Sequence, residues 1–248
     1  MKLIVAEDAD DLSRRAFALT EMLLAKTRNP AVVLPTGNTP LGLYAEAVKH
    51  GPGSRLAKAR FVQLDEYLDI AADDRRSLSR WFERVLLGPL GIPRERLVSF
   101  DSATRDAAAE AARIEGLVRG SGIALAILGL GPNGHLGFNE PGSAFDSVTR
   151  AVPLTLESIT SNAVYWGCEA DVPRRAFTLG LGTLATAKAT ILLVAGAHKA
   201  AILRRVLTDR PTAQVPATCL RVLPDCSVIA DRASLSQMSA REIAALSA

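Results

Sequence analysis

The strongest constraint on the fold is a repeated alternation between short apolar runs and longer stretches with helical periodicity. Apolar, strand-like runs occur at 31–35, 60–64, 123–128, 176–182, 189–196 and 227–231. Helical stretches alternate with them, at 41–50, 77–91, 106–119, 198–207 and from about residue 234. Apolar runs without polar alternation are typical of parallel strands buried on both faces. The pattern predicts an α/β fold with a mostly parallel central sheet and helices on both faces, Rossmann-like in its layering.

The chain is expected to form one domain over residues 1–248. Its 248 residues are 48% hydrophobic, which is enough for a large core, and no repeat or Pro/Gly/Ser-rich linker divides it. The net charge is only +3 with scattered basic residues, which argues against a nucleic-acid-binding face. No apolar run reaches the roughly 18 residues of a membrane span. An acidic N-terminal segment, unlike a secretory signal, and three cysteines without a C-x-x-C pair favour a reduced, cytoplasmic setting.

Residues capable of chemistry follow four of the predicted strands. These segments are PTGNTP (35–40), DEYLD (65–69), GLGPNGHLGFNEPGS (129–143) and AGAHK (195–199). In open parallel sheets, ligands bind outside the carboxyl ends of the strands. Because all four segments meet at that edge, the sequence predicts a site there.

The third segment matches G-x-G-x-x-G through Gly129, Gly131 and Gly134, but it is a poor dinucleotide-binding turn. That motif requires its last glycine to open a helix, whereas two further glycines and Pro141 follow here. We therefore expect no nucleotide cofactor. The segment instead places His135 on a glycine-rich loop with an acid five residues later. A structural histidine bonded to a backbone carbonyl remains an alternative.

Two further segments suggest a base and an anion cradle. Asp65 follows a buried strand, where a carboxylate acts either as a general base or as the cap of the next helix. Thr36, Gly37, Asn38 and Thr39 lie between a strand and a helix, and such a turn can bind a phosphomonoester through its amides and hydroxyls. Lys199 could supply a countercharge to the same phosphate. An ordinary capped turn and a surface lysine are the alternatives.

Taken together, these segments resemble the glucosamine-6-phosphate deaminase (isomerase) family over nearly the whole chain. LPTGNTPLGLY, LDEY, LGLGPNGHLGFNEPGS, TLGLGTL and GAHKA occur in the family's order and close to its spacing. The same superfamily contains 6-phosphogluconolactonases and sugar-binding domains of transcription regulators. The resemblance implies a small amino-sugar phosphate as substrate, and no metal or cofactor.

The resemblance also implies roles for individual residues. Asp65 matches the enolisation base, His135 the ring-opening acid/base, and Glu140 the acid that orients this histidine. Asn133 occupies a position that is Asp in some members and Asn in others. Thr36 to Thr39 and Lys199 match the phosphate-binding positions.

This chain departs from the family's pattern at several positions. Val164 stands where members often have a phosphate-contacting Arg in the segment that covers the site, and Arg174 or Arg175 is a conceivable replacement. Val152 replaces a basic residue of the allosteric members, although Ser143 and Arg150 of that set are present. The sequence also ends at Ala248, before the C-terminal extension of allosteric members. We expect hyperbolic kinetics and a monomer or small homo-oligomer.

Three other functions remain open. A galactosamine-6-phosphate deaminase would have the same motifs. A 6-phosphogluconolactonase would have the same fold, but it usually shows GHTASLFPG and DER where this chain has GHLGFNEPG and DEY. A non-catalytic sugar-phosphate sensor usually carries a helix-turn-helix domain ahead of this one, whereas this sequence starts with its first strand.

Overall fold

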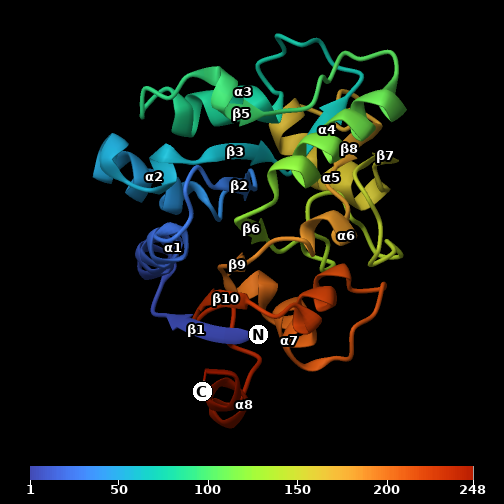
Figure 1. Cartoon of the computed structure of the whole chain (residues 1–248). Helices are drawn as coiled ribbons and strands as arrows, with labels where there is room; N and C mark the ends of the chain where they lie inside the picture. The colour runs from blue at the N-terminus through green and yellow to red at the C-terminus, as the bar shows by residue number, and fades with distance from the viewer. Residues whose placement is uncertain (248) are drawn as a thin grey trace.

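The computed structural model describes residues 1–247 and confirms the α/β fold with a mostly parallel sheet (Figure 1). The central sheet has seven strands, all parallel. Their spatial order is β1 (Lys2–Ala6), β10 (Cys226–Asp231), β9 (Thr190–Val194), β6 (Leu125–Gly129), β2 (Ala31–Leu34), β3 (Arg60–Gln63) and β5 (Leu97–Val98). None of the helices within residues 1–247 is both long and apolar enough to cross a membrane.

Helices cover both faces of this sheet, as Figure 1 shows, because each central strand is apolar on both sides. One core contains Val32 and Leu34 of β2 and is covered by α1 (Ala9–Leu24), α2 (Leu41–His50) and α3 (Leu78–Phe82). The other contains Ala31 and Val33 of the same strand and is covered by α4 (Ala107–Ser121), α7 (Ala200–Thr208) and α8 (Ala240–Ser247).

A second, three-stranded sheet was not expected from the sequence. It is antiparallel, in the order β4 (Asp65–Leu68), β8 (Arg175–Thr178) and β7 (Arg150–Pro153). The prediction of one strand over 176–182 was therefore wrong in its second half, where α6 (Leu181–Leu184) begins. A short apolar run has the same pattern in a buried strand and in a buried helix. The remaining helix α5 (Leu156–Trp166) connects β7 to β8.

The predicted start of the last helix near residue 234 was also wrong, since α8 begins at Ala240. A capping box sets this start: the amide of Ser239 donates to the Glu242 carboxylate at 2.8 Å, and the amide of Glu242 donates to the Ser239 hydroxyl at 3.3 Å. The segment before it turns at Asp231, whose carboxylate accepts a hydrogen bond from the amide of Ser234 at 2.7 Å.

The extended strand is interrupted at Leu64, between β3 and β4, and this interruption positions Asp65, the first acid of the site. Asp65 is the first residue of β4, not the last residue of the parallel strand before it. The amide of Leu64 still donates to the carbonyl of Leu34 at 3.3 Å, which keeps the turn on the parallel sheet. Asp65 consequently lies where the two sheets meet, at the carboxyl edge of the larger one.

Candidate active site

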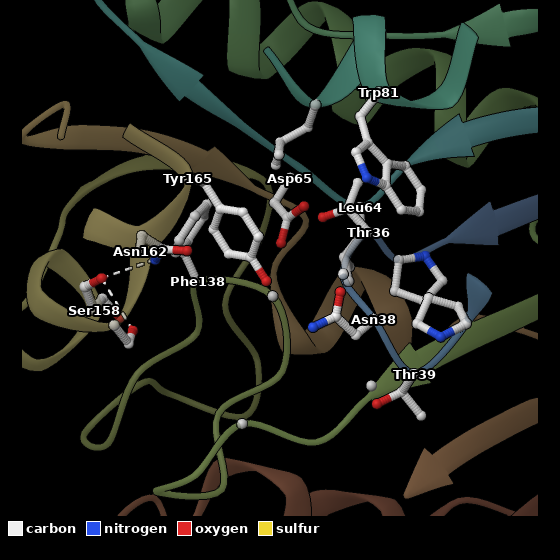
Figure 2. A pocket seen from close by; sticks show the side chains of 18 of the residues that line it. Thr36, Asn38, Thr39, Leu64, Asp65, Trp81, Phe138, Ser158, Asn162 and Tyr165 are labelled. Atoms are coloured by element: carbon white, nitrogen blue, oxygen red, sulfur yellow. Dashed lines mark hydrogen bonds between the residues drawn. The ribbon is translucent and has the colours of Figure 1, made fainter. Parts of the chain in front are cut away.

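A cavity of about 440 Å³ opens at the carboxyl edge of the parallel sheet. It brings together the predicted residues from all four segments: Thr36, Gly37, Asn38, Thr39, Asp65, His135 and Lys199. In Figure 2 the side chain of Asp65 points into this cavity, with Thr36 and Asn38 on one side and Tyr165 on the other. Asn133 and Glu140 are outside the lining and lie behind His135.

The turn from Pro35 to Pro40 leads from β2 into α2. Gly37 has a φ of 98°, a left-handed conformation that side chains rarely adopt, and the Pro35 carbonyl accepts a 2.7 Å hydrogen bond from the buried Tyr44 hydroxyl. The amides of residues 36–39 donate no hydrogen bond to other residues within 1–247. Unpaired amides beside the amino end of a helix make this turn a ready site for an anion.

Asp65 is a buried carboxylate without full hydrogen bonding. It is 8% exposed, and its Oδ1 has no hydrogen-bond partner among residues 1–247. Burial, and secondarily the neighbouring Glu66, raise the pKa of Asp65 to about 7. A carboxylate in this state exchanges protons readily near neutral pH. It is suited to a general base and does not cap a helix, because the cap of α3 comes from Ser77 and Glu66.

His135 lies against Glu140, with 3.3 Å between its Nδ1 and Oε2 of the acid. Burial disfavours the charge on Glu140, but His135, Ser158 and Asn133 outweigh burial and lower the pKa of its carboxyl to about 2. Asn133 donates to Oε2 of Glu140 at 2.9 Å, and the Ser158 hydroxyl donates to Oε1. Nδ1 lies within ion-pair distance of this acid but makes no hydrogen bond of acceptable geometry among residues 1–247. A charged acid at this distance attracts a proton to Nδ1.

Two glycines of the 129–142 loop are needed for close approach to the site. A Cβ on Gly131 would lie 2.2 Å from the His135 ring, and a Cβ on Gly137 would lie 3.3 Å from Oδ2 of Asp65. Gly137 also has a φ of 59°. Gly131 of the dinucleotide-like motif therefore makes room for the histidine, and Gly137, which lies outside that motif, makes room for the acid.

Lys199 ends a short 3₁₀ turn before α7 and extends into the cavity. Burial lowers the pKa of its ammonium group. It forms no ion pair with any acid of residues 1–247. Asp231 fixes the preceding backbone by accepting hydrogen bonds from the Gly196 amide at 3.0 and 3.1 Å.

Sequence reasoning missed the part of the cavity lining that comes from the segment around α3 and from α5. Its members are Arg75, Arg76, Leu78, Trp81, Arg84, Ser161, Asn162 and Tyr165. The basic cluster in DDRRSLSRWFER was the available signal, but such a run is equally typical of a solvated helix face.

The suggested replacements for the missing arginine lie elsewhere. Val164 is 78% exposed and outside the cavity lining. Arg174 and Arg175 do not line the cavity either, and Arg175 instead pairs with Asp69 at 2.7 Å. The idea that either arginine compensates for Val164 was therefore wrong in this conformation.

The arrangement combines an anion cradle with two proton-transfer groups in one cavity. A carboxylate with a pKa of about 7 and an imidazole beside an acid can move protons on a bound substrate, and the turn and Lys199 offer free donors for an anion. Within residues 1–247, no group of three or more His, Cys, Asp or Glu side chains is placed to hold a metal ion.

Comparison with known proteins gives a consistent set of relatives. The family model described as glucosamine-6-phosphate isomerases/6-phosphogluconolactonase matches residues 6–226. A glucosamine-6-phosphate deaminase of Bacillus cereus (strain G9842) is 34% identical over 239 residues, 96% of this chain and 90% of that protein. The corresponding protein of Bacillus thuringiensis (strain Al Hakam) is 33% identical with the same coverage.

Solved structures agree with this result. A monomeric glucosamine-6-phosphate deaminase superposes with a TM-score of 0.89 at 30% identity, covering 95% of this chain and 99% of that one. The 6-phosphogluconolactonase of Trypanosoma cruzi has a TM-score of 0.78 at 22% identity, covering 96% and 97%. The second likeness concerns the fold alone.

Proposed function

The chain belongs to the family of glucosamine-6-phosphate isomerases and 6-phosphogluconolactonases, and on that premise we propose that it is a deaminating aldose–ketose isomerase. Its substrate is a hexosamine 6-phosphate, with glucosamine 6-phosphate as the first choice, and its products are fructose 6-phosphate and ammonia. The observation that carries this proposal is the convergence of Asp65, His135 and the anion turn on one cavity.

Ring opening is the first step. A proton must leave the anomeric hydroxyl while another reaches the ring oxygen, and a neutral imidazole suits both transfers. Glu140 stays charged at 3.3 Å from Nδ1 of His135 and so keeps the proton on that nitrogen. The free Nε2 then serves as the acceptor and donor for the sugar.

The C2 proton is transferred next. Asp65 removes it from the open-chain amino aldehyde while the aldehyde oxygen takes up a proton, which gives an enolamine, and Asp65 returns a proton to C1. The resulting ketimine at C2 takes up water and loses ammonia, leaving the ketose. A base that is buried and mostly unpaired suits this step, because its pKa lies near working pH.

The 6-phosphate anchors the sugar away from the reacting carbons. The free amides of Thr36 to Thr39 and the ammonium of Lys199 are the proposed ligands. Binding energy from this remote group holds C2 close to Asp65.

A lactonase reaction is the second candidate, and the site supports it less well. Lactone hydrolysis needs an activated water but no base at C2, so the raised pKa of Asp65 would have no function there. Gluconolactone 6-phosphate should consequently be a poor substrate. Galactosamine 6-phosphate needs the same chemistry as glucosamine 6-phosphate, and a direct comparison of the two epimers decides between them.

The proposal also covers kinetics, oligomeric state and cellular location. In keeping with Val152 on β7, we expect hyperbolic kinetics without activation by N-acetylglucosamine 6-phosphate. We also expect a monomer or small homo-oligomer that works in cytoplasmic amino-sugar catabolism, including the breakdown of N-acetylglucosamine. A sigmoidal rate curve, or a hexameric mass by light scattering, would contradict these expectations.

The decisive assay is ammonia release from glucosamine 6-phosphate and galactosamine 6-phosphate by the purified chain. Activity is expected without added metal or nucleotide. Activity that a chelator abolishes and zinc restores would overturn the proposed mechanism.

A further inference from the structure

Three arginines line the cavity, and the proposed mechanism uses none of them. Arg75 and Arg76 precede α3, and Arg84 follows it in a single π-helical turn, Glu83–Leu87. Their positive charge lies at a cavity whose proposed ligand is a dianion. The question is which of them is available to bind it.

Arg76 is already engaged. Its Nε and Nη2 donate to the two carboxylate oxygens of Asp74 at 3.0 and 2.8 Å, and its guanidinium lies 4.3 Å above the ring centre of Trp166. These contacts tie the segment before α3 to the end of α5. Arg76 therefore has a structural role, and its guanidinium is already paired.

Arg75 and Arg84 are different. Neither forms an ion pair with an acid of residues 1–247, and both are exposed at the cavity. One Nη of Arg84 donates to the Arg75 carbonyl at 2.8 Å, which holds the two residues together. The remaining guanidinium donors of Arg84 have no acidic partner within that range.

A chain of contacts places this pair beside the anion turn. Trp81, one helical turn before Arg84, lines the same cavity, and its ring centre lies 5.9 Å from that of Tyr44. Tyr44 in turn donates to the carbonyl of Pro35, the first residue of the turn. Figure 2 shows Trp81 next to Thr36. The face of the helix that carries Trp81 and Arg84 therefore borders the phosphate end of the cavity.

We propose that Arg84, supported by Arg75, supplies a second cation for the substrate's phosphate, in addition to Lys199. This inference rests on the proposed function. It assigns to the α3 segment the charge that Val164 cannot provide from α5. A guanidinium presents paired N–H donors to phosphate oxygens, a geometry that one ammonium group cannot match.

The placement has a consequence for how the phosphate is held. Arg84 belongs to a helix whose neighbours Phe82 and Leu86 are buried in the core, whereas α5 exposes Val164 and Tyr165. The backbone that carries Arg84 is thus anchored in the core, while its side chain is exposed at the cavity. Phosphate binding should not require α5 to move.

The test is calorimetric titration of the full chain with fructose 6-phosphate and, separately, with inorganic phosphate. Arg84→Met should raise the Kd for both probes about tenfold, the typical effect of losing one charge-assisted hydrogen bond, and the double variant with Arg75→Met should raise it further. Arg84→Lys, which keeps the charge, should lose less. Arg80→Met is the matched control, because Arg80 lies on the same helix, pairs with Glu83 and is outside the cavity lining.

Each outcome bears on the inference or on the reaction. Wild-type affinity for both probes in Arg84→Met and in Arg75→Met would overturn the inference. Arg75→Met alters an exposed side chain, so the variant is expected to fold. An equal loss of affinity in the Arg80→Met control would overturn the inference too. A wild-type protein that binds neither probe would overturn it too. A wild-type protein that binds fructose 6-phosphate but releases no ammonia from either hexosamine 6-phosphate would contradict the proposed reaction and leave the phosphate site standing.

Discussion

Two neighbouring carboxylates of β4, Glu66 and Asp65, differ in their hydrogen bonding. Glu66 is fully buried, and its oxygens accept hydrogen bonds from the Gln63 side chain and from the amides of Tyr67, Leu78 and Ser79 at 2.8–3.0 Å. Asp65, one residue earlier, faces the cavity with Oδ1 unpaired among residues 1–247.

This difference separates a structural acid from a reactive one. Burial raises the pKa of both groups, but donors oppose the effect only at Glu66. A buried carboxylate without partners costs folding free energy, so its presence at a cavity indicates function. Four predictions test the contrast, from the largest expected effect to the smallest.

The first is Asp65→Asn, which should lower turnover by about two to four orders of magnitude, the usual loss when a general base is removed. Binding of fructose 6-phosphate should change little. Because the folded-state pKa of Asp65 is raised from 3.8 to about 7, stability falls as pH rises through this interval and stays at the lower value above it. The variant should therefore gain more in Tm over wild type at pH 8 than at pH 4. Retained activity would mean that the base is another residue.

The second concerns pH in the wild-type protein. Asp65 must be ionised to accept the C2 proton, so kcat/KM should fall as pH drops through about 7, by about tenfold per unit below it. A pH series of initial rates measures this limb. An acid limb near 4 would show that Asp65 behaves like an ordinary carboxyl.

The third prediction concerns Glu140. The pKa of its carboxyl is lowered to about 2, so Glu140 stays charged at every pH at which Asp65 titrates. Glu140→Gln should lower kcat by on the order of tenfold to a hundredfold through misorientation of His135. An open-chain substrate analogue should be spared. An equal loss on the closed and open forms would place Glu140 outside ring opening.

The fourth is Glu66→Gln, the matched control for the first. A glutamine amide cannot accept from all of the donors around that position, so the free energy of unfolding should fall by about 1–3 kcal/mol. Turnover by the folded fraction should stay within about tenfold of wild type. Chemical denaturation measures the free energy of unfolding, and activity normalised to the folded fraction measures turnover. A loss of turnover as large as that of Asp65→Asn would contradict the distinction between a structural Glu66 and a reactive Asp65.

The cavity wall on the parallel sheet was predictable from the sequence. Buried parallel strands are continuous apolar runs, and their carboxyl ends point to the same edge. The positions of Thr36, Asp65, His135 and Lys199 directly after such runs are therefore enough to group them at one site. This prediction needs only local sequence, because each apolar run and the residues that follow it are adjacent in the chain.

The lining from the α3 segment and α5 was not predictable in this way, and neither was the antiparallel sheet. Strand length is not the reason, because β2 and β3 also have four residues. β4, β7 and β8 pair across long sequence separations, and such pairing leaves no local signal in the sequence. Arg75 and Arg84 lie in a charged stretch, and only the packing of Trp81 against Tyr44 turns that stretch toward the cavity. Asp65 and Glu66 are adjacent in sequence, and only the surrounding donors distinguish them.

The most direct measurement of the central claim follows the C2 proton. Glucosamine 6-phosphate is converted in D₂O, and NMR records ammonia release together with deuterium at C1 of the fructose 6-phosphate formed. We expect wild type and Glu66→Gln to form product that carries solvent deuterium at C1 to the extent that the proton exchanges while it is on Asp65, and Asp65→Asn to form almost no product. Product formation by Asp65→Asn at a rate near wild type would contradict the assignment of Asp65 as the base.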